Sequence, residues 1–215
     1  MGLGISVGIL CDQARNDPEG YAHHHDAFDN LTHALAAEGI TWREPEVIHK
    51  AGDDHDYSTG FPYSYLSHLR RVFTLARLGE AVTPWSAVSD DQYRHDLMKV
   101  DDETVMFSSH LLCHSDNEGY YIPVAFDDPL FLPEEAQVAG VGMVGSSHRL
   151  RAELAGFAAA LGIRLDEQGA LSDDEAAAVE ATGEDDAFAA ERYVWLHLYR
   201  ACLASIGSGH AIVFC

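Results

Sequence analysis

Residues 104–126 read TVMFSSHLLCHSDNEGYYIPVAF, and this stretch predicts a β-hairpin. Two runs with β-branched and aromatic side chains flank a polar turn at 115–119 that contains a glycine. Neighbouring runs joined by such a short turn pair in antiparallel fashion. The stretch therefore favours an antiparallel sheet over the parallel sheet of a doubly wound fold.

Helical patterns surround the hairpin without alternating strictly with strands. Phe28, Leu31 and Leu35 share one face of a predicted helix that Gly39 ends, and Pro62 begins a second helix. Further helices are expected near 90–98, 147–161, 172–181 and 184–207, strands at 4–10 and 210–215, and a loop at 40–60. We therefore predict a helix-rich α+β fold, a single domain over residues 1–215, with a small, mainly antiparallel sheet of about four strands.

The strong negative charge restricts the kinds of partner. The chain carries 35 Asp and Glu against 13 Lys and Arg, a formal net charge of −22. Such a field repels nucleic acid and anionic membranes and attracts basic proteins. The alternative is an acidic surface that serves only solubility, as in a high-salt habitat. The apolar runs are short for a membrane span, and the first residues lack a basic signal region, so a cytoplasmic protein is expected.

A metal site is one interpretation of residues 110–118. His110, His114 and a carboxylate from Asp116 or Glu118 have the ligand chemistry of zinc or another divalent metal. A metal-assisted hydrolase would follow from that interpretation. A Cys113 nucleophile is disfavoured, because neighbouring strand residues point to opposite faces and Cys113 could not pair with His114.

A protein-binding surface is the second interpretation of the same stretch. The turn would present Asp116, Glu118, Tyr120 and Tyr121, since tyrosines are common interface anchors. An ordinary turn with tyrosines in the core remains the alternative. An acidic segment further along the chain would supply the rest of the surface. Its candidate residues are Asp173, Asp174, Glu175, Glu184, Asp185 and Asp186.

Two other motifs have plain structural explanations. His25, Asp29 and His33 fall on one stripe of the first predicted helix, away from its apolar face, as a solvated polar face would. The GVGMVGSSHRL stretch at 140–150 suggests an anion-binding helix start at Gly145–Arg149, but it lacks a phosphate-loop lysine. An ordinary Gly/Ser helix start is favoured there.

HLLCHSDNEGYYIP, GVGMVGSSHRL and the terminal AIVFC together resemble bacterial proteins that have no assigned activity. Small acidic proteins of this kind are similar in character to immunity proteins of polymorphic toxin systems. We therefore expect a protein that neutralises a basic partner, most plausibly a cognate toxin, with no cofactor. A hydrolase is the alternative, so the assignment leans away from an enzyme. The oligomeric state stays open.

Overall fold

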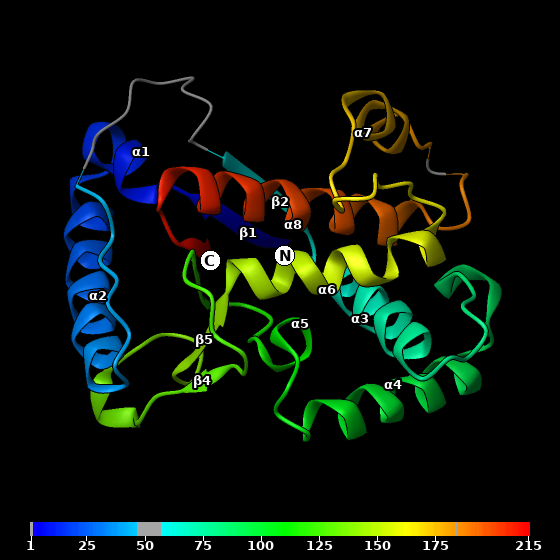
Figure 1. Ribbon diagram of the computed structural model, residues 1–215, viewed down its shortest axis with the longest axis horizontal. Helices are drawn as coiled ribbons and strands as arrows, with labels where there is room; N and C mark the ends of the chain where they lie inside the picture. Colours follow the sequence, from blue (N-terminus) through cyan, green and yellow to red (C-terminus); the bar gives the residue numbers. More distant parts are fainter. Residues whose placement is uncertain (1, 47–56, 184) are drawn as a thin grey trace.

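The computed structural model describes residues 2–46, 57–183 and 185–215, which form a six-stranded sheet surrounded by helices (Figure 1). The strands are β1 (Gly2–Val7), β2 (Tyr57–Pro62), β3 (Gly119–Ile122), β4 (Leu130–Phe131), β5 (Met143–Ser146) and β6 (Ile212–Phe214). The α-helices are α1 (Ile9–Asn16), α2 (Pro18–Ala37), α3 (Tyr63–Arg77), α4 (Asp90–Thr104), α5 (His110–Cys113), α6 (Ser147–Phe157), α7 (Asp173–Glu180) and α8 (Ala189–Ser208). Short 3₁₀ segments are η1 (Trp85–Ala87), η2 (Glu134–Ala136) and η3 (Ala158–Leu161).

The predicted α+β class is confirmed, but the sheet has more strands than predicted and is not mainly an antiparallel sheet of about four strands. The strand order is β2-β1-β6-β3-β5-β4, six strands instead of about four. The sheet is mixed, because β3 and β5 run parallel while the other neighbours are antiparallel. The connection from β3 to β5 includes the short edge strand β4, which was not among the predicted strands.

Strand β3 is buried on both of its faces. Tyr121 belongs to the larger core, together with residues of α3, α6 and α8, whereas Tyr120 and Ile122 belong to a smaller core under α2. This division follows from the two-residue repeat of a strand. Strand β6 divides in the same way, with Ile212 on the larger core and Val213 on the smaller.

Most predicted helices are present, and their ends follow the local signals. Phe28, Leu31 and Leu35 are the buried residues of α2, and Asp17 caps its start. Ser146 and Ser172 accept backbone N–H bonds at the starts of α6 and α7, as N-caps do. The expected end of the last helix at Gly207 is two residues early, because Gly209 is its C-cap.

The predicted hairpin at 104–126 is wrong. Its first half contains the end of α4 and the short helix α5, so β3 has no partner strand on that side of the turn. The expected strand at 4–10 ends at Val7, and α1 begins at Ile9. The expected loop at 40–60 lies partly outside the described residues, and its last residues belong to β2.

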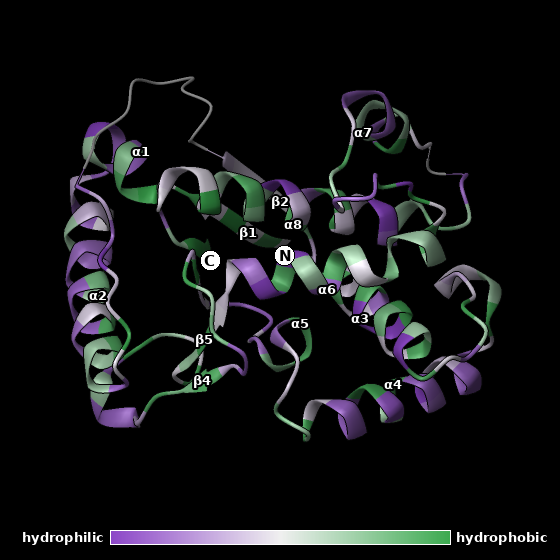
Figure 2. Ribbon diagram, viewed as in Figure 1, coloured by the Kyte–Doolittle hydropathy of each residue, from purple (hydrophilic) through white to green (hydrophobic). Residues whose placement is uncertain are grey.

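Hydrophilic residues predominate on α4, whereas α2 mixes both kinds (Figure 2). Helices α2 and α8 each contain 20 residues. Among the described residues, however, none of the helices combines the length and the apolar character that a membrane crossing requires.

Close packing of β3 against β5 makes Gly145 sensitive to substitution. A Cβ atom at Gly145 would lie 2.2 Å from Cδ1 of the buried Tyr121 ring. We expect Gly145→Ala to lower the free energy of unfolding by about 1–3 kcal/mol, the usual cost of overpacking. Urea unfolding measures it. Gly156→Ala, at an exposed position of α6, is the control: a Cβ there meets nothing within 4 Å, and the change should stabilise by about 0.5–1 kcal/mol.

Candidate partner-binding surfaces

Buried polar contacts fold residues 109–116 into a compact turn. The Glu153 carboxylate accepts hydrogen bonds from the backbone N–H groups of His110 and Leu111, at 2.9 and 2.8 Å. At the other end, Arg70 donates to the carbonyl oxygens of Leu111 and His114. A carboxylate at the start of α5 and a guanidinium at its end satisfy the groups that a short helix leaves unpaired.

The two histidines of this stretch are core residues. Ser146 N–H donates to His110 Nδ1 at 2.9 Å, and His110 Nε2 lies 3.1 Å from the Asp127 carbonyl oxygen. The His114 ring stacks on Tyr121 with centroids 4.1 Å apart. Among the described residues no three His, Cys, Asp or Glu side chains are arranged to hold a metal ion, so the proposed cluster of His110, His114, Asp116 and Glu118 does not assemble.

The tyrosines of the turn are also unavailable to a partner. Tyr120 and Tyr121 are 3% and 1% exposed, so the alternative with core aromatics describes them correctly. Asp116 is exposed and forms an ion pair with Arg70. Glu118 is exposed without an ion pair among the described residues. Of the four turn residues predicted to meet a partner, only these two carboxylates reach the surface.

The acidic segment around α7 divides into structural and free carboxylates. Glu175 is buried and accepts from the Arg164 backbone and guanidinium at 2.8–3.0 Å. Asp186 pairs with Arg192 at 2.8 Å. Asp173, Asp174 and Asp185 are exposed and form no ion pair within the described part of the chain. Glu184, also predicted, lies outside the described residues. We call Asp173, Asp174 and Asp185 the α7 surface.

An open cleft of about 670 Å³ lies at the end of α7 and the start of α8, where Asp186, the neighbour of Asp185, lines it. Tyr65, Trp85 and Tyr193 line it together with Glu180 and Asp186. Trp85 and Tyr193 are each 41% exposed, which sets them apart from the tyrosines of β3. No local sequence pattern predicts this cleft, because its walls come from β2, α3, η1 and α8, which are far apart in the chain.

A second acidic surface, on α4, was also missed. Asp90, Asp101 and Asp102 are exposed and form no ion pair among the described residues. The helix is fixed to α3 by Arg71 and Asp96, whose side chains are almost fully buried and 2.7 Å apart. Burial opposes ionisation of Asp96, but hydrogen bonds from Gln92 and Arg71 and the charge of Arg71 outweigh it, so the pKa of Asp96 is lowered.

Almost every described cation already has a carboxylate partner. These pairs join Arg43 to Glu46, Arg70 to Asp116, Arg71 to Asp96, Arg77 to Glu103, Arg94 to Asp91, Lys99 to Glu80, Arg149 to Asp127, Arg164 to Glu175, Arg192 to Asp186 and Arg200 to Glu180. Arg15 and Arg151 are the exceptions within the described ranges. The carboxylates that remain free therefore set the charge of the surface.

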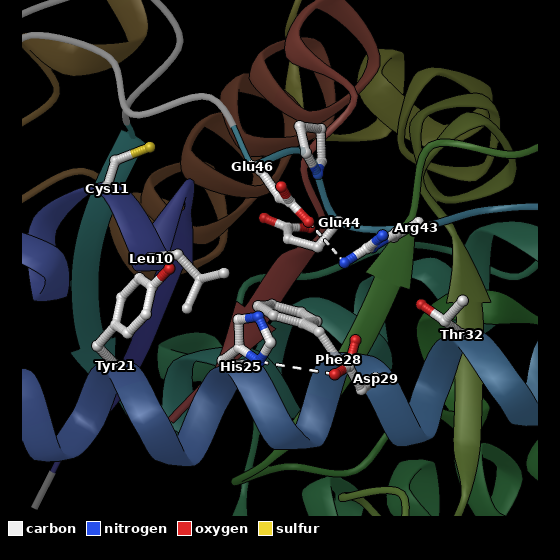
Figure 3. Close-up of a pocket in the computed structure, with 11 residues that line it drawn as sticks. Leu10, Cys11, Tyr21, His25, Phe28, Asp29, Thr32, Arg43, Glu44 and Glu46 are labelled. Carbon is white, nitrogen blue, oxygen red and sulfur yellow. Dashed lines mark hydrogen bonds and ion pairs between the residues drawn. The ribbon is translucent and has the colours of Figure 1, made fainter.

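The two remaining motifs are the polar stripe of α2 and the start of α6. His25 Nδ1 lies 3.6 Å from Asp29 beside a cavity of about 20 Å³, which has room for about one water (Figure 3). At the start of α6, Ser146 Oγ accepts from the Arg149 backbone N–H, and the Arg149 guanidinium pairs with Asp127. The chain's own groups therefore occupy the predicted anion position.

Comparison with known proteins identifies the family of the chain. A family model described as "Putative DNA-mimic protein" matches residues 1–214. No curated protein matches the chain, and no solved structure matches it. The family match agrees with an acidic protein that binds a basic partner.

Burial of His110 and His114 predicts a loss of stability in acid. Burial, and to a lesser extent the Arg149 charge, lowers the pKa of His110 to about 4, and burial lowers the pKa of His114 to about 3. An unfolded histidine has a pKa of about 6.5. Between about pH 6.5 and pH 4 the unfolded chain therefore binds protons that the folded chain excludes, and stability falls as the pH falls.

Replacing His110 should reduce that acid sensitivity. Between pH 7.5 and pH 4 the free energy of unfolding should fall in both proteins. We expect the fall to be smaller in His110→Gln than in the wild type, by up to about 3 kcal/mol. Urea unfolding at both pH values measures the difference. Carboxylate protonation affects both proteins equally and cancels in the comparison. Equal losses in the two proteins would contradict the assignment of His110 as a buried neutral imidazole.

Proposed function

The chain belongs to the family described as "Putative DNA-mimic protein", and on that premise we propose that it binds a basic DNA-binding protein in place of DNA. The single observation that carries the proposal is the set of exposed carboxylates that have no cation partner in the described chain. DNA presents a dense array of phosphate charges to its proteins. Free carboxylates on a rigid fold present the same sign of charge to the same cationic surface.

The α7 surface and its cleft are the proposed contact. Asp173 and Asp174 project from the first turn of α7, and Asp185 follows in the next segment. The exposed rings of Trp85 and Tyr193 lie in the adjoining cleft, where lysine or arginine side chains of the partner would meet aromatic faces and carboxylates. Carboxylates would speed the encounter, and the aromatic side chains would slow dissociation.

A more specific hypothesis is that the basic partner is a toxin that acts on nucleic acid. Such a toxin needs a cationic cleft for its substrate, and a carboxylate surface that fills the cleft would inhibit it. The chain would then act as the immunity protein of that toxin. This hypothesis is motivated by the strong acidity of the chain.

Displacement by DNA tests the proposal. The tag-free protein is immobilised and exposed to nuclease-treated extract of its source, and bound proteins are eluted with duplex DNA. The purified partner is then titrated with labelled duplex DNA and with this protein. We expect mutually exclusive binding that weakens as salt rises. A partner that binds DNA and this protein at the same time would contradict mimicry.

Charge variants locate the contact. We expect the triple variant Asp173→Asn, Asp174→Asn and Asp185→Asn to bind about tenfold more weakly. The estimate assumes that each lost surface charge pair costs roughly 0.2–1 kcal/mol of binding free energy. The triple Glu19→Gln, Asp26→Asn and Glu38→Gln removes the same charge from exposed positions of α2 and its end. That control should change affinity less than about twofold. Equal weakening by both triples would show that net charge alone drives binding.

A further inference from the structure

An exposed apolar ridge continues from the end of α4. Met98, Val105, Met106 and Phe107 are 56–66% exposed, and Phe131 of β4 is 49% exposed. Phe107 and Phe131 meet edge to face with ring centroids 5.2 Å apart. These five residues, which we call the α4 ridge, make up half of the exposed large apolar side chains among the described residues. Contiguous exposed apolar side chains mark interaction sites more often than isolated ones do.

The backbone at Phe107 is strained. Its φ angle is 53°, in the left-handed region that disfavours side chains other than glycine. Its N–H donates to the Thr104 carbonyl at 3.0 Å, just beyond the end of α4. Within two residues of the ends of α2, α3 and α8 the chain uses Gly39, Gly79 and Gly209 for this left-handed conformation. A phenylalanine that is both strained and exposed contributes little to folding, and strain of this kind points to function.

Acidic side chains accompany the ridge. Asp101 and Asp102 lie between Met98 and Val105 at helical spacings of three and four residues, so the four share one face of α4. Arg77, the nearby cation, is already paired with Glu103 and bonded to Ser108. This arrangement repels a second copy of the chain, which carries the same negative charge. It attracts an apolar surface bordered by lysine or arginine.

We propose that the α4 ridge docks an amphipathic segment of a basic protein, with Phe107 as its anchor and Asp101 and Asp102 as its charged border. The inference goes beyond the proposed function, because it concerns a different surface and requires no DNA-binding partner. The buried pair of Arg71 and Asp96 holds α4 in place, so the helix that carries Met98 and leads into the rest of the ridge is fixed to α3.

Peptide binding tests the proposal without knowledge of the natural partner. The probes are a helical peptide of leucine and lysine and a control peptide in which glutamine replaces leucine at unchanged charge. We expect the wild type to prefer the leucine peptide by about tenfold, the effect of one buried aromatic anchor. Phe107→Gly should abolish that preference and leave binding of the control peptide unchanged. Leu203→Gln, at an exposed apolar position on α8, should leave both affinities unchanged.

Stability measurements separate binding from folding. Phe107→Gly should raise the urea midpoint, because glycine relieves the left-handed backbone and the lost ring is more than half exposed. A lower midpoint would show that the ring packs for stability and would overturn its role as anchor. Met106→Gln, at a residue without positive φ, should also reduce the preference for the leucine peptide.

Two further outcomes would overturn the proposal. One is an undiminished leucine-peptide preference in both ridge variants. The other is a dimer in sedimentation that Phe107→Gly dissociates, since the ridge would then be a contact between copies of this chain. Neither outcome bears on DNA displacement at the α7 surface, so the two proposals can fail separately.

Discussion

A shortage of cations shapes both the interior and the surface of this protein. With 13 Lys and Arg against 35 Asp and Glu, few carboxylates can be neutralised within the chain. The two arginines that lie deepest hold elements in place: Arg70 bonds the carbonyls at the end of α5, and Arg71 fixes α4 through Asp96. Removing either partner of the buried pair of Arg71 and Asp96 would leave an uncompensated charge, which typically costs about 3–5 kcal/mol. Most of the other described cations pair near the surface, Arg15 and Arg151 being the exceptions, so most exposed carboxylates in the described chain stay free.

Local signals predicted the long helices, and distant contacts decided the rest. The α2 stripe of Phe28, Leu31 and Leu35 and the Ser172 cap need only neighbouring residues to be recognised. The run at 104–114 is apolar and β-branched, and periodicity alone does not separate a buried strand from a short helix. Its helical state depends on Glu153 and Arg70, which lie about forty residues away in opposite directions along the chain. No local pattern encodes those contacts.

The candidate site also combines features that the local sequence predicts with features that depend on distant contacts. Exposure of Asp173 and Asp174 follows from an acidic helix start, which the sequence displays directly. Burial of Tyr120 and Tyr121 depends on two layers of helices that cover β3 from opposite sides. The turn was therefore assigned correctly as a surface feature but wrongly as the source of aromatic anchors. Exposed aromatic residues occur instead at Trp85, Tyr193 and Phe107, each placed by packing between distant segments.

Unpaired carboxylates also connect stability to binding. In the free protein they repel one another, which disfavours the compact state because the unfolded chain separates its charges. A basic partner would remove that repulsion as it binds, so part of the binding free energy comes from within this chain. Added salt would screen both effects, favouring the free fold while weakening the complex. Apolar contacts are less sensitive to salt, and the α4 ridge and the aromatic cleft would sustain association where charge alone would not.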